Sequence, residues 1–169
     1  MITFATPKGT TILLDDVDRD LIQYKWNNME GYAYRQVGSR KGRTTILMHR
    51  EIAARSLGRA LVRGEHIDHI NGNRSDNRRR NLRVATRSEN MRNRPHTRVN
   101  HLALKGVRLR HDLTSRPYLS MITLSDQRFY IGYFSSPEEA AWMYDQWAIH
   151  LHGEYARLNF EYVEVEAQL

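Results

Sequence analysis

The chain has 169 residues, with 26 Lys and Arg against 19 Asp and Glu, and it contains no cysteine. This length fits one domain or two small modules, and the lack of cysteine excludes a disulfide framework and a thiolate zinc site. No apolar run approaches the roughly 18 residues of a membrane span, and the first residues lack the order of a signal peptide. We therefore expect a soluble, cytoplasmic protein with no membrane partner.

The positive charge is concentrated in the middle of the chain. Residues 41–98 hold 15 basic and 5 acidic side chains, a net charge of +10, whereas residues 1–40 and 99–169 have net charges of 0 and −3. Fourteen of these 15 basic residues are Arg, whose planar guanidinium binds phosphate oxygens in pairs. The block favours a polyanionic partner such as double-stranded DNA. A solvated basic face is the alternative.

The first half of the chain shows strand patterns and then a helix pattern. Short strands are predicted within residues 1–47 by four β-branched or aromatic segments, ITFAT, TTILLDD, GYAYRQV and RTTILMH. A helical turn is expected at residues 18–24. Met48, Ile52 and Ala53 recur at helical spacing with Leu57, and Gly58 supplies a stop, which predicts a helix over residues 48–57.

The last third of the chain predicts a small sheet and one helix. Residues 96–104 are interpreted as a linker. Alternating segments at 105–110, 118–124 and 128–134 predict three antiparallel strands, with Val107 and Leu109 on the core face. A capping box predicts the start of a helix, and Gly153 its end; the box consists of Ser136, Pro137 and Glu139. The face that we expect to pack on the sheet carries Ala140, Tyr144, Trp147, Ala148 and Leu151.

The stretch from His66 to Asn90 concentrates groups that suit phosphodiester hydrolysis. Such a reaction needs a base for water, a hard cation and oxygen ligands for that cation. A neutral imidazole at His69 supplies the base, and Asp68 and Asn90 supply oxygen ligands for Mg²⁺. A turn at 71–72, a return strand at 81–84 and a helix at 87–92 predict a ββα unit.

These residues resemble the HNH endonucleases, in particular the phage and intron-encoded homing type. The segment DHINGNRSDNRRRNLRVATRSEN carries the likeness, and MHREIA upstream resembles the helix before the motif. The resemblance implies that His69 is the general base, that Asp68 and Asn90 bind Mg²⁺ or Mn²⁺, and that Asn81 holds the catalytic loop. It also implies a ββα-metal nuclease core at 48–95, with a β-rich part at 1–47, in a bacterial or phage-infected cell. Many members have His where this chain has Asn90.

Several residues near the motif keep two interpretations. His66 is either a further ligand or, as we favour, a strand-surface residue, and His49 is structural or phosphate-facing rather than catalytic. The pair at 76–77 is interpreted as a turn that bonds its own backbone. Next to such a site, DNA backbone contacts are favoured over a solvated run for Arg78, Arg79, Arg80 and Arg83.

Residues 105–160 resemble the Apetala-two/ERF DNA-binding domain, and the closing HGEYARLNF carries much of the likeness. In that family the exposed sheet face enters the major groove, which admits a β-ribbon. The resemblance implies the DNA-facing residues Lys105, Arg108, Arg110, Arg128 and Tyr130. Met121 and Thr123 depart from the family pattern. Trp142, Tyr144 and Trp147 are interpreted as core aromatics, and residues 161–169 as a tail.

The sequence thus predicts an α+β protein: a metal-dependent DNA endonuclease joined to a three-stranded sheet packed on one helix. The alternative is a non-catalytic DNA-binding regulator with a vestigial motif. A vestigial site usually loses a member of the trio Asp68, His69 and Asn90. All three are present, which favours the enzyme.

Overall fold

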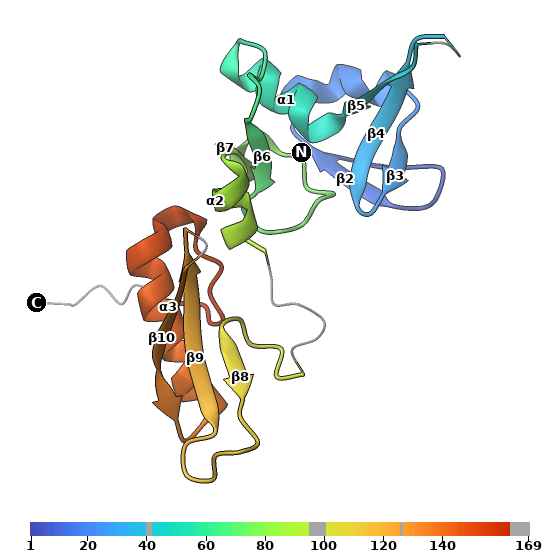
Figure 1. Cartoon of the computed structure of the whole chain (residues 1–169). Coiled ribbons are helices and arrows are strands. Elements are labelled where there is room, and N and C mark those ends of the chain that lie inside the picture. The colour runs from blue at the N-terminus through green and yellow to red at the C-terminus, as the bar shows by residue number, and fades with distance from the viewer. Residues whose placement is uncertain (40–41, 95–100, 126, 163–169) are drawn as a thin grey trace, which may run out of the picture. The chain divides into compact units, whose positions relative to one another are not determined.

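The computed structural model describes residues 1–39, 42–94, 101–125 and 127–162. The chain divides into two compact units, Met1–Asn90 and Met91–Leu169 (Figure 1). Each unit combines short antiparallel strands with helices, so the mixed α and β composition is confirmed. Parts of the expected linker and tail, residues 96–100 and 163–169, lie outside the described residues. No described helix combines the length and apolar character that a membrane span requires.

The first unit begins with short strands around a 3-10 helix. These elements are β1 (Ile2–Ala5), β2 (Thr11–Leu14), η1 (Asp16–Gln23), β3 (Asn27–Met29), β4 (Tyr32–Val37) and β5 (Thr44–Leu47). β1 pairs with β2, and β3, β4 and β5 form a second antiparallel sheet in chain order. The four predicted strands are present. β3 was not predicted, because its sequence NNM lacks β-branched residues and depends on pairing with β4.

The predicted helix is confirmed as α1, Met48–Leu57. It buries Met48 and Ile52 against the core of the first unit. Leu57, which the helical spacing grouped with them, is instead 42 % exposed. Gly58 ends the helix with a φ of +64°, a left-handed conformation that costs glycine little. The other buried members of this core are Ile12, Leu14, Leu21, Trp26 and Ala33.

A hairpin and a short helix complete the first unit. β6 (His66–His69) pairs antiparallel with β7 (Leu82–Ala85), and η2 (Arg79–Asn81) and α2 (Arg87–Arg92) flank β7. Directly after β6, the amide of Gly72 donates to the carbonyl of His69 at 2.8 Å, which confirms the predicted turn. The order strand, strand, helix is therefore present. The register places Asp68 opposite Arg83.

The second unit is a three-stranded antiparallel sheet packed on one helix, as predicted. Its elements are β8 (Val107–Leu109), β9 (Tyr118–Leu124), β10 (Gln127–Phe134), α3 (Pro137–His152) and η3 (Gly153–Tyr155). β9 is the central strand. Gly106, at a φ of +77°, lies so close to Tyr144 that a side chain at 106 would overlap the tyrosine ring. Val107 is buried, and Leu109 lies on the same face, opposite the core residue Tyr118, but it is 39 % exposed.

Helix α3 starts and packs largely as the sequence predicts. The Ser136 hydroxyl accepts from the Glu139 amide, while the Glu139 carboxylate accepts from Ser135 instead of closing the box. Tyr144 is buried, but Trp142 and Trp147 are 49 % and 40 % exposed, so interpreting them as core residues was wrong. The buried stripe also takes in Asp145 and His152, which shifts its centre away from Trp147.

Asp145 fastens the closing segment of the second unit. Its buried carboxylate accepts hydrogen bonds from the backbone N–H and the side-chain Nδ2 of Asn159. It also accepts from the backbone N–H of Phe160 and from the Tyr162 hydroxyl. The Asn159 side chain in turn bonds both the amide and the carbonyl of Lys105. The segment after α3 is thereby tied to the residue that leads into β8.

Candidate active site in the first unit

Strand β6 delivers two adjacent polar side chains, Asp68 and His69, into the first unit. Each is only 4 % exposed. Buried polar groups need partners, because an unpaired one costs about 1–3 kcal/mol. We therefore expect each of these two side chains to have polar partners within the fold.

The ring of His69 packs against two other rings. Its centroid lies 5.9 Å from that of Tyr32 on β4 and 5.2 Å from that of His49 on α1. Burial lowers the pKa of His69, while its hydrogen bond to Asn77 opposes this shift. The imidazole is therefore neutral near pH 7, as a general base must be.

His49 is buried as a structural part of this cluster, 5 % exposed. Burial lowers its pKa to about 3, and electrostatic interactions with His69 and Arg50 act in the same direction. Its Nδ1 has no hydrogen-bond partner within the part of the chain that the structure describes. The Arg74 guanidinium also stacks over the Tyr32 ring, 4.7 Å from the ring centroid.

Asn77 is the polar neighbour of His69. Its Oδ1 lies 3.5 Å from His69 Nε2, and its Nδ2 donates to the Ser75 carbonyl at 3.3 Å. The second contact confirms the predicted local turn bond. The pattern of turn residues gave no sign that Asn77 is 1 % exposed and faces the histidine.

The loop after His69 is held by Asn81. Its Oδ1 accepts from the Asn71 amide at 3.0 Å, and its Nδ2 donates to the Asp76 carbonyl at 2.7 Å. The Asn71 side chain donates to Asp76 Oδ2 at 2.9 Å. These bonds connect both ends of the loop, so the position of Asn77 depends on them.

The loop is also joined to strand β2. The amide of Leu13 donates to the Ser75 carbonyl at 2.9 Å, and the amide of Asn77 donates to the Leu13 carbonyl at 2.8 Å. This short parallel bridge pairs Leu13 with Asp76. The β-rich N-terminal strands thus fix the backbone that carries Asn77.

Asp68 forms an ion pair across the hairpin. Its Oδ2 accepts from Arg83 Nε at 2.9 Å and from a terminal guanidinium nitrogen at 2.7 Å. The Arg83 side chain is 11 % exposed. Arg83 therefore faces the carboxylate that the resemblance assigns to a metal.

The resemblance assigns two oxygen donors to a hard cation. Asp68 on β6 supplies a carboxylate, and Asn90 on α2, half-buried in the same unit, supplies an amide oxygen. Mg²⁺ prefers such oxygens and usually keeps several waters. Among the described residues, no group of three or more His, Cys, Asp or Glu side chains could hold a metal. A cation here would therefore depend on these two donors and water.

The three consecutive arginines have different surroundings. Arg78 bonds Asp76 through two guanidinium nitrogens, at 2.7 and 2.5 Å. Arg79 bonds the fully buried Asp18 at 2.8 and 2.9 Å. Arg80 is exposed and makes no side-chain hydrogen bond or ion pair within the described chain. The geometry leaves Arg80 as the member of the run most able to meet a phosphate.

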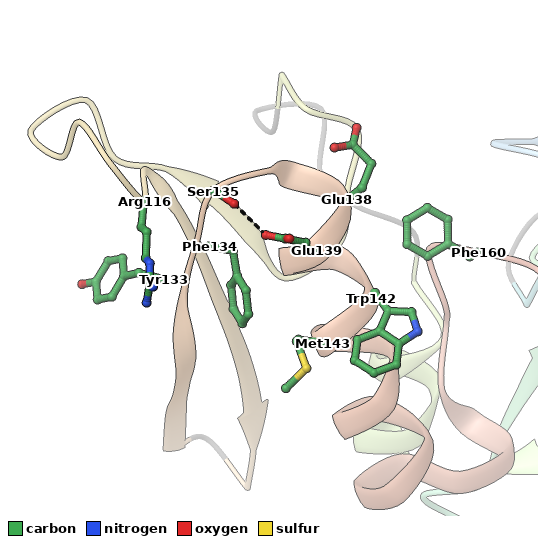
Figure 2. Close-up of a pocket in the computed structure, with 9 residues that line it drawn as sticks. All are labelled: Arg116, Tyr133, Phe134, Ser135, Glu138, Glu139, Trp142, Met143 and Phe160. Atoms are coloured by element: carbon green, nitrogen blue, oxygen red, sulfur yellow. Dashed lines mark hydrogen bonds between the residues drawn. The ribbon is translucent and has the colours of Figure 1, made fainter.

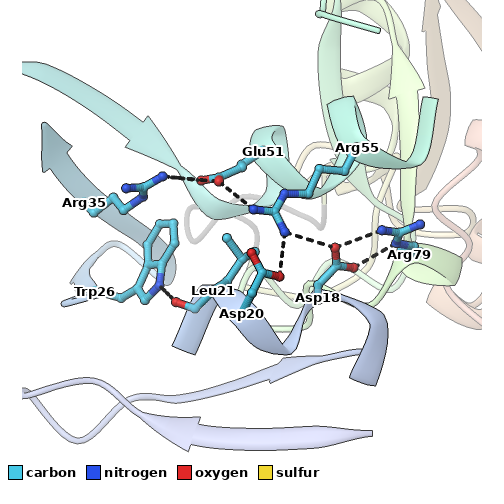
Figure 3. Close-up of polar contacts among 8 residues, drawn as sticks. All are labelled: Asp18, Asp20, Leu21, Trp26, Arg35, Glu51, Arg55 and Arg79. Carbon is cyan, nitrogen blue, oxygen red and sulfur yellow. Dashed lines mark hydrogen bonds and ion pairs between the residues drawn. The ribbon is translucent and has the colours of Figure 1, made fainter. Parts of the chain in front are cut away.

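Figure 3 shows that Arg79 belongs to a chain of ion pairs across the first unit. Asp18 also faces Arg55 at 3.8 Å, and Arg55 bonds Asp20 at 2.8 Å and Glu51 at 3.2 Å. Glu51 continues the chain to Arg35 on β4. These pairs connect η1, α1, β4 and η2, so part of the basic block stabilises the fold.

The outward sheet face of the second unit carries the other candidates. Register places Arg108 opposite Leu119, Thr123 opposite Arg128 and Met121 opposite Tyr130. Arg108 and Arg128 are exposed, and Tyr130 is 67 % exposed. These three side chains, together with the departing residues Met121 and Thr123, therefore share one face.

Two further candidates are engaged within their own unit. Arg110 bonds Asp112 through two nitrogens, at 2.9 and 2.7 Å. The Lys105 ammonium donates to the Arg92 carbonyl, and burial lowers its pKa to about 8. Neither is as available to DNA as Arg108 or Arg128.

In the first unit, His66 on β6 is half-buried and pairs in register with Ala85.

An open groove also lies on the second unit, between the sheet and α3 (Figure 2). Its apolar lining includes Phe134, Trp142, Met143 and Phe160, and Glu138 and Glu139 lie along it. It contains none of the residues predicted for catalysis. The exposure of Trp142 is explained by its place in this groove.

Comparison with known families agrees with the geometry of the first unit. Residues 47–92 match the family model described as HNH endonuclease. The matched segment contains Asp68, His69, Asn81 and Asn90, and it supports an HNH nuclease that acts on DNA. No curated protein and no solved structure matches the chain.

Proposed function

We propose that the chain is a metal-dependent DNA endonuclease of the HNH homing type, which hydrolyses phosphodiester bonds at a preferred site. The observation that carries this is the buried His69, held between Tyr32, His49 and Asn77 and adjacent to Asp68. A base poised in this way suits the removal of a proton from water near neutral pH.

In the proposed reaction, His69 takes a proton from a water whose oxygen attacks phosphorus. The bond from phosphorus to the 3′ oxygen breaks, and the products carry 5′-phosphate and 3′-hydroxyl ends. Asp68 and Asn90 would hold the divalent cation, which supplies charge stabilisation at the phosphate and the leaving oxygen. Asn81 keeps the loop in shape, and Arg80 is placed to contact the DNA backbone.

We further propose that the second unit is an Apetala-two/ERF-type DNA-binding domain. Support comes from its three-stranded sheet on one helix and from the exposed Arg108, Arg128 and Tyr130 on one sheet face. A β-ribbon with such side chains fits the major groove, where base edges can be distinguished. Preference for a site would then come from this unit.

Incubation with supercoiled plasmid tests the activity. The full chain with Mg²⁺ should give nicked or linear DNA, and EDTA should stop the reaction. His69→Ala should lower the rate by about 10²–10⁴-fold, the usual cost of a lost general base, with gel-shift affinity within a few fold. His66→Ala, on the same strand, is the matched control and should cleave as the parent does. Wild-type cleavage by His69→Ala would reject the base assignment.

A further inference from the structure

The side-chain amide of Asn77 has a defined orientation beside His69. Its Nδ2 donates to the Ser75 carbonyl at 3.3 Å. A carbonyl oxygen only accepts hydrogen bonds, so the NH₂ group must face Ser75. The atom that lies 3.5 Å from His69 Nε2 is then the amide oxygen, Oδ1.

This orientation determines which ring nitrogen of His69 carries the proton. An oxygen acceptor opposite Nε2 is satisfied only if Nε2 carries a hydrogen and donates it. A neutral imidazole has one N–H, so its lone pair in the ring plane is then on Nδ1. The same contact therefore selects Nδ1 as the basic nitrogen.

The surroundings keep this contact in place. Asn77 is 1 % exposed, and its backbone N–H donates to the Leu13 carbonyl at 2.8 Å. His69 is packed between the rings of Tyr32 and His49, which limits rotation of the imidazole. Reversing the Asn77 amide would set two oxygens against each other at Ser75.

We propose that Asn77 is a positioning residue that holds His69 as the Nε2–H tautomer, so that Nδ1 accepts the proton of the attacking water. The inference rests on the proposed nuclease function. Asn77 is not itself a catalytic residue, because it acts only through the ring of His69.

The tautomer can be observed directly by ¹⁵N NMR of the full chain labelled at histidine. The His69 signals are assigned by their loss in His69→Ala. We expect a pyrrole-type shift at Nε2 and a pyridine-type shift at Nδ1 at pH 7.5. A His69 protonated at Nδ1 in the unaltered chain would overturn the proposal before any variant is made.

Three variants separate the tautomer from the stability of the loop. Asn77→Leu keeps the volume but removes the acceptor, and it should lose the Nε2–H preference. Asn77→Asp keeps an oxygen acceptor and should retain it. Asn73→Leu is the control: Asn73 accepts from Ser75 in the same loop without contacting His69. An unchanged tautomer in folded Asn77→Leu would overturn the proposal. If Asn77→Leu does not fold, Asn77→Ala replaces it.

Cleavage kinetics connect the tautomer to function. Asn77→Leu should lower kcat by about 10²–10⁴-fold with little change in KM, because the base is lost and DNA contacts are not. Asn77→Asp should recover most of the rate. Equal rate loss in both variants would overturn the positioning role. If the unaltered chain shows the Nε2–H tautomer and does not cleave DNA, the proposed function fails and the tautomer assignment stands.

Discussion

His49 illustrates how single residues of the first unit serve the site through burial. It is a polar side chain inside an aromatic cluster, with a pKa of about 3. In the unfolded chain a histidine has its ordinary pKa of about 6.5. The difference makes the stability of the folded chain depend on pH.

The unfolding free energy should fall as pH decreases from about 6.5 towards 3, because the unfolded chain then binds a proton that folded His49 does not. Between pH 7.5 and 5.5 this one residue should contribute a loss of about 1.4 kcal/mol. His49→Phe keeps a ring of similar shape and should remove that part of the pH dependence. Urea unfolding at both pH values measures it. Identical losses in the two proteins would contradict the expectation.

Asp68 and Asn90 should determine the metal dependence of cleavage. Asp68→Asn removes a charged oxygen ligand, and Asn90→Ala removes an amide oxygen, so each should raise the Mg²⁺ concentration needed for half-maximal rate. The effect should be larger for Asp68→Asn. Asn73→Ala, an exposed loop residue, serves as the control. The two-donor site would be rejected if both variants kept the parental Mg²⁺ dependence.

At the scale of elements, adjacent arginines in one turn perform different tasks. Arg79 in η2 donates two hydrogen bonds to the buried carboxylate of Asp18 in η1, whereas Arg80 is exposed to solvent. Removing one partner of a buried pair leaves the other uncompensated, which is strongly destabilising. Sequence proximity therefore does not predict a shared function.

We expect Arg79→Ala to lower the unfolding free energy by about 2–3 kcal/mol, since Asp18 loses two charged hydrogen bonds. Arg80→Ala should change stability by no more than about 0.5 kcal/mol. It should instead weaken DNA binding and reduce the salt dependence by about one phosphate contact. Urea unfolding and binding at several salt concentrations measure both effects. Equal effects of the two variants on stability would contradict this assignment.

Elements with a local signal could be predicted from the sequence, and contacts between distant residues could not. The spacing of Met48 and Ile52 with the stop at Gly58 predicts α1, because helix periodicity and capping are local properties. The partner of Arg79 lies 61 residues away, and no spacing rule connects them. The same limit applies to Tyr32, which reaches His69 only through the fold.

The sequence predicts residue types for the candidate site but not its geometry. Residue types and order identify Asp68 and His69 as the polar pair of the motif. The orientation of Asn77 depends on the Leu13 backbone, which lies in a different part of the sequence. A turn pattern cannot reveal that a turn residue is buried by another strand.

At the scale of the whole molecule, the net charge overstates the surface available for DNA. Within the part of residues 41–98 that the structure describes, ion pairs with carboxylates engage Arg55, Arg59, Arg74, Arg78, Arg79 and Arg83. Counterion release scales with the phosphates that are neutralised, by about 0.9 in slope for each. The salt dependence of binding should therefore be lower than the charge count suggests.

The two units should contribute differently to affinity and preference. Arg108→Ala with Arg128→Ala should lower discrimination between DNA sites by about 10-fold or more, because base contacts are each worth about 1–3 kcal/mol. As a matched pair in the first unit, the exposed Arg63→Ala with Arg87→Ala should lower the salt slope and leave discrimination unchanged. Cleavage mapping on a long DNA and binding at several salt concentrations measure both quantities. Unchanged site preference in the first double variant would show that this sheet face does not read DNA.

The bridge between Leu13 and the loop at Ser75 and Asn77 determines the shortest segment of the chain that can carry the motif into another protein. The family match starts at residue 47, yet the amide of Asn77 and the carbonyl of Ser75 have their partners at residue 13. A fragment excised at the boundary of the motif would leave both groups without these partners, and the amide of Asn77 would exchange more readily with water. Because both amides belong to the same bridge, we expect those of Leu13 and Asn77 to exchange at similar rates, and grafting this motif onto another scaffold requires a strand that replaces β2.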